Sequence, residues 1–265
     1  MNFGLPAVQA LLLRHGWLVR GALAVALGVV FAMGVASGFR GWIPAAVALA
    51  ISVVALTGWL RWRRERFIRE APFPQFLKRK LRESYPHLAQ KDAELVERGL
   101  RQFFLACHRC ERRFVAMPSR VVDAMWHEFI LHTQAYRAWC ALAMGRFLHH
   151  TPSEVLGANA ARNDGLRRAW YWSCREEAIA PRVPTRLPLL FALDTKLEIP
   201  NGFRYEPDCH HAFGARDAGA GAVHCAATFG DGSASGDGEG FGGEVSSDGD
   251  GDGDGGGDGC GGGGD

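Results

Sequence analysis

Two uncharged stretches near the N-terminus decide the architecture, and they read GALAVALGVVFAMGVASGF at residues 21–39 and GWIPAAVALAISVVALTGWL at residues 41–60. At about 1.5 Å per helical residue, each stretch is roughly 30 Å long, which is the thickness of the hydrocarbon core of a bilayer. Only Arg40 separates them, so the two helices have to run antiparallel. The pattern predicts a transmembrane hairpin over residues 21–60, with spans at 21–39 and 41–60.

The charges that flank the two spans predict the orientation of the hairpin. Arg14 and Arg20 precede the first span, whereas five arginines follow the second: Arg61, Arg63, Arg64, Arg66 and Arg69. Because basic flanks stay on the cytoplasmic side, we expect a cytoplasmic segment at 1–20 and a cytoplasmic C-terminal part. A cleaved signal peptide is the competing interpretation. Its apolar region is shorter, however, and no second span with a basic stop follows it.

The net charge of +2 hides two regions of opposite sign. Residues 1–217 hold all 30 Lys and Arg against 18 acids, whereas residues 218–265 hold ten acids and no base. From Gly230 onward half the residues are glycine, and such a segment buries too little apolar surface to offset its ordering entropy. The sequence therefore predicts a disordered, acidic Gly/Asp-rich tail at 212–265, with weak cation binding as the alternative role.

Helical periodicity dominates the region between hairpin and tail. After a basic juxtamembrane linker at 61–74, we expect an α-helical globular domain at 75–211. One helix is expected near residues 91–113, a second from Ser119 to about Ala143 with Gly145 ending it, and a third at 164–179. Signals for β-strands are few. The predicted fold class is mainly α: a transmembrane hairpin, a helical domain and a disordered tail.

One helix of this domain carries a candidate metal site. Asp123 and His127 are four residues apart, so their side chains can touch on a helix. His149 and His150 follow Gly145 and could fold back toward them. Asp123, His127 and one of the two later histidines would form a set of nitrogen and oxygen ligands for Zn or Fe(II). No other cofactor is indicated.

Simpler interpretations of the same residues stay open. Asp123 could merely orient His127 in one tautomer, and acid–base catalysis is a further alternative. The zinc-protease pattern is rejected, because His132 follows His127 at i+5 rather than at the required i+4.

The CxxC pair Cys107 and Cys110 has the spacing of a zinc site, and Cys209 and His210 would complete that weaker metal set. Both cysteines of the pair, however, lie on the apolar stripe of the helix expected at 91–113. Free cysteine behaves there as a small hydrophobe. Packing in the core is therefore the favoured interpretation.

Several functional classes find no support. Phosphate-binding loops, dinucleotide fingerprints and nucleophile elbows are absent from the sequence. The arginines are scattered, which argues against nucleic-acid binding. Only four of the 30 basic residues are lysine (Lys78, Lys80, Lys91 and Lys196), and such a bias is typical of a GC-rich bacterial genome. We therefore expect a multi-pass protein of the bacterial inner membrane.

The run from Val121 through Asp123 to Trp126-His127 resembles the glycine-rich domain-containing protein family. The resemblance continues in Tyr136, Cys140, Gly145 and His149-His150, then in Leu190–Asp194 and Gly202–Tyr205 up to Cys209. It covers about residues 75–211 and implies a shared domain without an established biochemical activity.

These observations favour a membrane-anchored interaction or scaffold module, which is more consistent with a non-enzyme than with an enzyme. The lipid bilayer and unidentified proteins would be its partners. The alternative is a metal-binding enzyme or sensor that uses the Asp/His site.

Overall fold

The computed structural model of the chain describes residues 5–38, 40–151, 160–207 and 223–225. In chain order its elements are α1 (Ala7–Ser37), η1 (Arg40–Trp42), α2 (Ile43–Glu70), α3 (Phe76–Ser84), α4 (Gln90–Arg109), α5 (Arg120–Leu131), α6 (Thr133–Ala143), α7 (Ala160–Glu176), α8 (Leu189–Lys196), β1 (Arg204–Glu206) and β2 (Val223–Cys225). The predicted mainly helical fold is confirmed.

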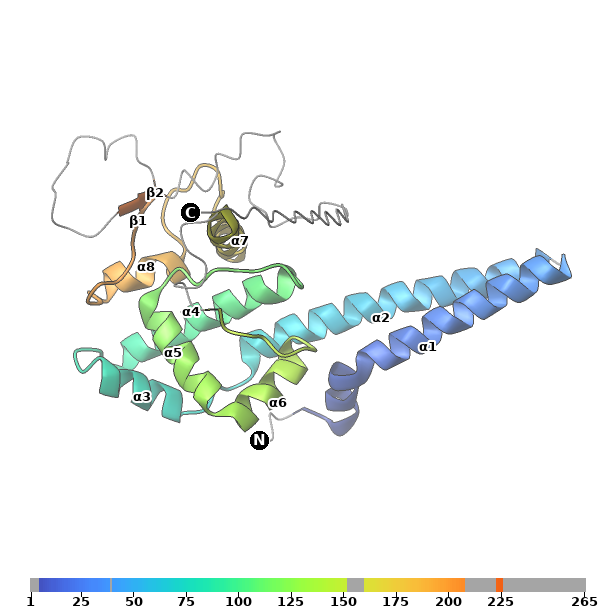
Figure 1. Cartoon of the computed structure of the whole chain (residues 1–265), viewed down its shortest axis with the longest axis horizontal. Helices are drawn as coiled ribbons and strands as arrows, with labels where there is room; N and C mark the ends of the chain where they lie inside the picture. Colours follow the sequence, from blue (N-terminus) through green and yellow to red (C-terminus); the bar gives the residue numbers. More distant parts are fainter. Residues whose placement is uncertain (1–4, 39, 152–159, 208–222, 226–265) are drawn as a thin grey trace, which may run out of the picture.

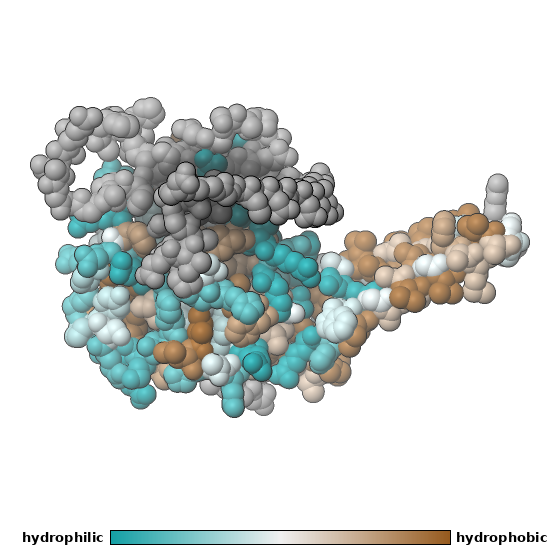
Figure 2. Space-filling model, viewed as in Figure 1, coloured by the Kyte–Doolittle hydropathy of each residue, from teal (hydrophilic) through white to brown (hydrophobic). Residues whose placement is uncertain are grey.

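Helices α1 and α2 pair along their length and project as an arm from the helical domain (Figure 1). Only 6% of the residues in the apolar window of each helix are buried in the protein. A core helix of a soluble protein would bury most of such a window, whereas here the arm exposes an apolar surface (Figure 2). Both helices are long and apolar enough to cross a membrane.

The segment predicted as a linker, 61–74, is largely helical. No helix breaker precedes Pro72, so α2 continues to Glu70, and its residues Phe67 and Ile68 are buried in the core of the domain. The Arg64 guanidinium donates to the Leu13 carbonyl at 2.9 Å, and Arg109 of α4 pairs with Glu65 at 2.9 Å. The arm is therefore joined to the domain by a continuous helix and by polar contacts, not by a flexible connection.

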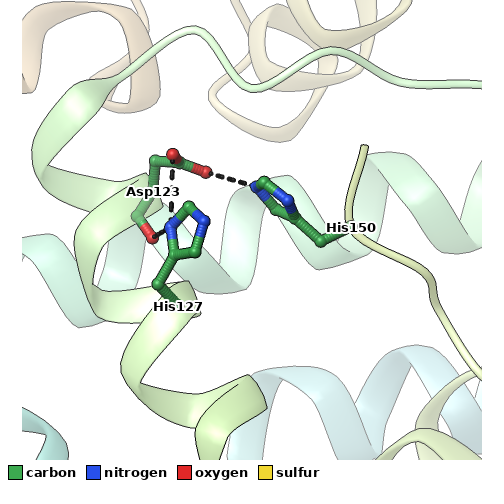
Figure 3. A group of neighbouring side chains, drawn as sticks. All are labelled: Asp123, His127 and His150. Carbon is green, nitrogen blue, oxygen red and sulfur yellow. Dashed lines mark hydrogen bonds and ion pairs between the residues drawn. The ribbon is translucent and has the colours of Figure 1, made fainter. Parts of the chain in front are cut away.

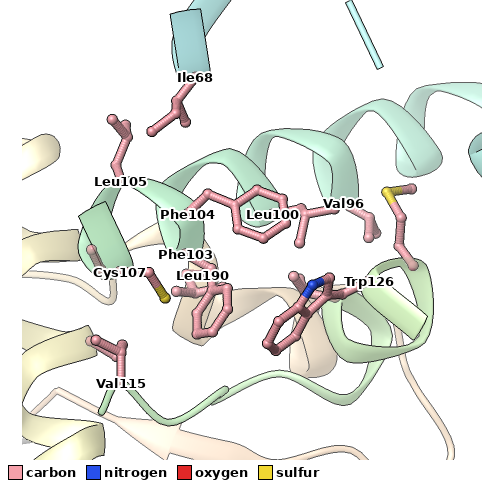
Figure 4. Packing of buried hydrophobic residues seen from close by; sticks show 14 of the residues in the cluster. Ile68, Val96, Leu100, Phe103, Phe104, Leu105, Cys107, Val115, Trp126 and Leu190 are labelled. Carbon is pink, nitrogen blue, oxygen red and sulfur yellow. The ribbon is translucent and has the colours of Figure 1, made fainter. Parts of the chain in front are cut away.

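Helix α4 lies at the centre of the domain core, in contact with α3, α5, α7 and α8. Its apolar stripe packs against apolar side chains of the neighbouring elements (Figure 4). The buried members include Val96, Leu100, Phe103, Phe104 and Cys107 of α4, with Trp126 and Leu190 packed opposite them. The predicted stripe is confirmed, although the helix ends at Arg109 and not at Arg113.

The helix expected from Ser119 to Ala143 is two helices, α5 and α6. The break lies at His132, whose φ of −87° and ψ of 63° are not helical. The His132 ring stacks on Phe76 of α3, with a distance of 3.8 Å between ring centroids. After the break, α6 turns to pack against both α1 and α2. The packing of α6 against the arm is therefore more favourable than a continuation of α5 through His132.

The predicted disordered tail lies outside the described residues except for β2. This strand pairs in parallel with β1, with Arg204 opposite Val223 and Glu206 opposite Cys225. Its sequence, Val-His-Cys, lacks the glycine and aspartate that dominate the rest of the tail. This short strand is therefore an exception to the disorder predicted for 212–265.

Candidate metal centre

Three side chains from two segments converge at the first half of α5. The Asp123 carboxylate lies between the rings of His127 and His150 (Figure 3). Its Oδ1 is 3.1 Å from His150 Nε2, and its Oδ2 is 3.3 Å from His127 Nδ1. One ligand atom from each residue lies within 4.8 Å of the other two. The two imidazole rings are close but tilted, with 4.2 Å between their centroids and an interplanar angle of 58°.

The hydrogen bonds of His127 decide which of its nitrogens is available. Its Nδ1 lies 2.9 Å from the main-chain oxygen of Asp123, one helical turn earlier. Because a carbonyl oxygen can only accept, Nδ1 carries the proton in this arrangement. The neutral ring then presents Nε2 with a free lone pair. Metal-binding histidines commonly have this arrangement, in which one nitrogen donates to a backbone carbonyl while the other binds the ion.

A chain of buried hydrogen bonds holds the segment that carries His150. Trp126 Nε1 donates to the Tyr136 hydroxyl at 3.1 Å, and that hydroxyl donates to the Leu148 carbonyl at 2.7 Å. The Trp126 ring also packs edge-on against the His150 ring, at 4.7 Å between centroids. α5, α6 and the segment after Gly145 are thereby fixed to one another, and this brings His150 to Asp123.

A second buried carboxylate holds the start of α5. Asp194 of α8 is 2% exposed and accepts four hydrogen bonds. The donors are the Ser119 hydroxyl at 2.7 Å and the main-chain N–H groups of Arg120 (2.7 Å), Val121 (3.1 Å) and Phe203 (2.9 Å). A carboxylate at a helix N-terminus satisfies free N–H groups and interacts favourably with the helix dipole. Asp194 thus positions the turn that carries Asp123.

The three side chains differ in exposure. His150 is 14% exposed, Asp123 is 32% exposed and His127 is 51% exposed. The site is therefore anchored on its His150 side and open to solvent on its His127 side. A solute or a water molecule has access to an ion held there.

The spacing of the ligand atoms suits a small divalent ion. Neighbouring ligands of a tetrahedral ion at about 2.0–2.1 Å are roughly 3.3 Å apart, and Asp123 Oδ1 and His150 Nε2 are 3.1 Å apart. Two histidines and one carboxylate form a ligand set used by Zn and by Fe(II) sites with open coordination positions. Without an ion, the carboxylate has a hydrogen bond with His150 and a close contact with the His127 ring.

Sequence reasoning did not distinguish His149 from His150, and the structure separates them. Exposure alternates along residues 147–150, as it does where successive side chains point to opposite sides. Leu148 is buried and His150 is largely buried, whereas His149 is exposed and packs on Phe147, at 4.8 Å between ring centroids. His149 is not part of the group formed by Asp123, His127 and His150.

The weaker predicted set is not assembled among the described residues. Cys107 and Cys110 are buried free thiols. Burial raises the pKa of the Cys107 thiol well above its usual value and that of Cys110 to about 11, so both remain protonated at neutral pH. A metal ligand has to be the thiolate. Cys209 and His210 lie outside the described residues. The interpretation of the two thiols as core residues agrees with their burial.

Three supporting residues were not assigned a role from the sequence. Trp126, Tyr136 and Asp194 all lie in the stretches that carry the family resemblance. Trp126 donates to Tyr136, Tyr136 donates to the Leu148 carbonyl, and Asp194 accepts from the α5 N-terminus. Each of these hydrogen bonds joins residues that are ten or more positions apart. No local pattern reports such contacts. An aspartate in an otherwise apolar run, as in Leu190–Asp194, is the one available signal, because burying a charge without partners is costly.

Comparison with known proteins identifies one family. A family model described as UCP032817-like matches residues 63–229, which is more than half of the chain. No curated protein and no solved structure matches the chain significantly. The matched region contains Asp123, His127, His150 and all three supporting residues, and it begins after the predicted second span. The resemblance to the glycine-rich domain-containing proteins stays a prediction.

Proposed function

Because the chain belongs to the UCP032817-like family, whose description names no activity, we propose its function from its own residues. It is a membrane-anchored metal-binding protein, and its helical domain binds Zn or Fe(II) through Asp123, His127 and His150. The observation that carries this proposal is the approach of three ligand atoms to within 4.8 Å of one another.

The surroundings of the three ligands support this proposal. His127 donates its Nδ1 proton to a backbone carbonyl, and the segment of His150 is held by Tyr136. Such outer contacts orient the ligands before the ion arrives, which lowers the cost of binding. Three protein ligands leave at least one coordination position open, as in catalytic sites and in sensors that exchange a ligand. The exposed side of His127 gives access to that position.

In this proposal the arm anchors the domain at a membrane surface. In the proposed topology both helices of the arm cross the bacterial inner membrane, and the domain and both termini are cytoplasmic. The arginines that follow residue 60 support this orientation, because they are concentrated on the domain side of the arm. Since α2 enters the domain core without interruption, the metal site has a defined orientation relative to the bilayer.

A scaffold or interaction module, acting on protein partners without a metal, is the second candidate. The observation that favours it is that Asp123 already has two partners, His127 and His150, without an ion. The rigid junction of arm and domain would then serve to present the domain to partners at the membrane. The acidic residues after Asp217 would attract basic surfaces on those partners.

Metal content distinguishes the two candidates. The full chain, purified in detergent micelles, is reconstituted with Zn or, anaerobically, with Fe(II), and bound metal is measured by elemental mass spectrometry. We expect about one equivalent in the wild type and in His149→Ala, and much less in His150→Ala. The adjacent histidine is a matched control, because both substitutions remove one imidazole from the same segment.

The possible outcomes are distinct. Metal retained by His150→Ala, or lost equally from both variants, would contradict the assigned ligands. An absence of bound metal from the wild type after reconstitution would leave the scaffold as the better account. Topology is tested separately with C-terminal reporter fusions: alkaline phosphatase activity at the C-terminus would show that the domain is not cytoplasmic.

A further inference from the structure

An open, basic cavity lies apart from the metal ligands, alongside the second half of α4. It has a volume of about 620 Å³ and is lined by residues of α4, α7 and α8, of the α7–α8 connection, and by Arg69 near the end of α2. None of the three metal ligands lines it. Five of its lining side chains are cationic, and two are acidic: Glu176 and Glu177.

Both acids of this cavity are already engaged. Glu176 accepts two hydrogen bonds from Arg69, at 3.0 and 2.9 Å, and pairs with Arg109 at 3.0 Å. Glu177 accepts from the Gln102 amide at 2.7 Å and from the Leu189 main-chain N–H at 2.6 Å, and it also pairs with Arg186. Burial alone would raise the Glu177 pKa, but these donors together lower it. Both carboxylates are therefore already paired within the domain, and neither is left to neutralise a further cation.

Two cations of the cavity have no such partner. Arg98 of α4 and Lys196 of α8 make no hydrogen bond or ion pair with any residue in the described ranges. Arg101, one turn after Arg98, already pairs with Glu97 at 2.7 Å and donates to the Ile68 carbonyl at 2.7 Å. The cavity thus carries two uncompensated positive charges between two helices that pack together.

Apart from Gln102, the remainder of the lining is apolar. Leu105, Leu187 and Leu189 supply aliphatic surface beside these cations. A ligand that suits both parts combines an anionic group with an apolar body. Two unpaired cations correspond in charge to a phosphate monoester, which carries about −1.5 to −2 at neutral pH. Arginine and lysine are the usual partners of phosphate oxygens.

We propose that this cavity binds a small organic phosphate, with Arg98 and Lys196 holding the phosphate group and the leucines contacting its apolar part. The phosphate could belong to a soluble molecule or to an anionic lipid headgroup. In the proposed topology, Arg69 lies nine residues beyond the second span, or roughly 14 Å along α2. The headgroup layer is only about 5–8 Å thick. The distance favours a soluble phosphate.

Calorimetry on the full chain tests this proposal with phenyl phosphate as the probe and inorganic phosphate for comparison. The chain is placed in phosphatidylcholine nanodiscs. We expect saturable binding of phenyl phosphate, tighter than that of inorganic phosphate because the ring contacts the leucines. The double variant Arg98→Gln/Lys196→Gln should bind at least tenfold more weakly, since both charge-assisted contacts are lost.

The control is Lys91→Gln/Arg112→Gln. It removes the same charge from two exposed residues that do not line the cavity, and it should bind phenyl phosphate like the wild type. All four positions are exposed, so the variants should fold, which thermal unfolding verifies. An equal loss in both double variants would reduce the effect to net charge and overturn the proposal. An absence of saturable binding would also overturn it.

Repeating the titration in nanodiscs that contain phosphatidylglycerol identifies the source of the phosphate. If a headgroup occupies the cavity, phenyl phosphate binds the wild type more weakly in these discs than in phosphatidylcholine. If affinity is the same in both, the ligand is a soluble phosphate. Because the metal ligands do not line this cavity, failure here would leave the metal proposal unaffected, and metal content would still decide that proposal.

Discussion

His150 Nε2 lies 3.1 Å from Asp123 Oδ1 although the two residues are 27 positions apart in the chain. A helix break at His132 and the left-handed residue Gly145, with φ of 68°, lie between them. The contact therefore depends on how α6 is held against α5, and the Tyr136 hydroxyl makes the hydrogen bonds that join these segments. We therefore predict the effect of replacing Tyr136, and we add predictions for Asp194 and His108.

Removing the Tyr136 hydroxyl should loosen the segment of His150. In Tyr136→Phe, the Leu148 carbonyl and Trp126 Nε1 lose their partner in a buried environment, which costs about 1–3 kcal/mol of stability. Since the substitution acts through the position of His150, metal affinity should fall about tenfold or more. Thermal unfolding and competition with a chelator measure the two effects.

The control for this substitution is Tyr85→Phe, which removes a hydroxyl that makes no hydrogen bond among the described residues. It should change stability by less than about 0.5 kcal/mol. Unchanged metal affinity in Tyr136→Phe would show that the hydroxyl does not position His150.

Asp194→Asn should destabilise the domain strongly. The amide retains one acceptor oxygen and turns its NH2 group toward two of the four donors, either Ser119 and Val121 or Arg120 and Phe203. Loss of a buried, four-bonded carboxylate at a helix start should cost about 2–4 kcal/mol. Denaturant unfolding of the full chain in micelles is the measurement.

Asp164→Asn is the matched comparison for this change. Asp164 is half exposed, and its ion pairs with Arg167 and Arg168 are long, at 4.0 and 3.9 Å. Such a pair contributes about 0–1 kcal/mol. Similar losses of stability in the two variants would argue against a special role for Asp194.

Acid should destabilise the domain through His108. Burial lowers the pKa of this imidazole from 6.5 to about 4, with Arg64 and Arg109 adding to the effect and Glu65 opposing it. The unfolded chain therefore binds a proton between pH 6.5 and 4 that the folded chain does not. The contribution is complete above pH 6.5 and declines as pH falls toward 4, by up to about 3 kcal/mol.

The His108 effect is isolated by comparing variants. The difference in unfolding free energy between wild type and His108→Gln, followed from pH 7.5 to 4, should shift in favour of the variant as pH falls. His149→Gln, which replaces an exposed imidazole, should follow the wild type. A difference between wild type and His108→Gln that is independent of pH would contradict the assignment.

Local patterns were sufficient for the two long apolar helices, for the stripe of α4 and for two of the three residues of the candidate metal site. The apolar stretches at 21–39 and 41–60 identify α1 and α2, because length and lack of charge are properties of the segment itself. The stripe of α4 and the i,i+4 relation of Asp123 and His127 are equally local, and both are present in the structure. In each case 3.6-residue periodicity alone determines which side chains share a face.

Other features depend on packing between distant segments. The linker expected at 61–74 became the end of α2, because Phe67 and Ile68 find a buried position beside α4 and α6. The long helix expected after Ser119 broke at His132, where α6 gains contact with the arm. Local helix propensity predicts neither outcome, because the burial of aromatic and aliphatic surface competes with it in each case.

By itself, then, the sequence determined a chain of two long apolar helices, a mainly helical body and an Asp–His pair on one helical face. The tertiary structure alone decided that His150 and not His149 completes this pair, that Asp194 caps α5, and that Arg98 and Lys196 share a cavity. The physical reason is the range of the interactions. Helix formation and the spacing of side chains on a helix follow from near neighbours, whereas these contacts join residues from separate helices and connections, whose approach depends on how the whole core packs.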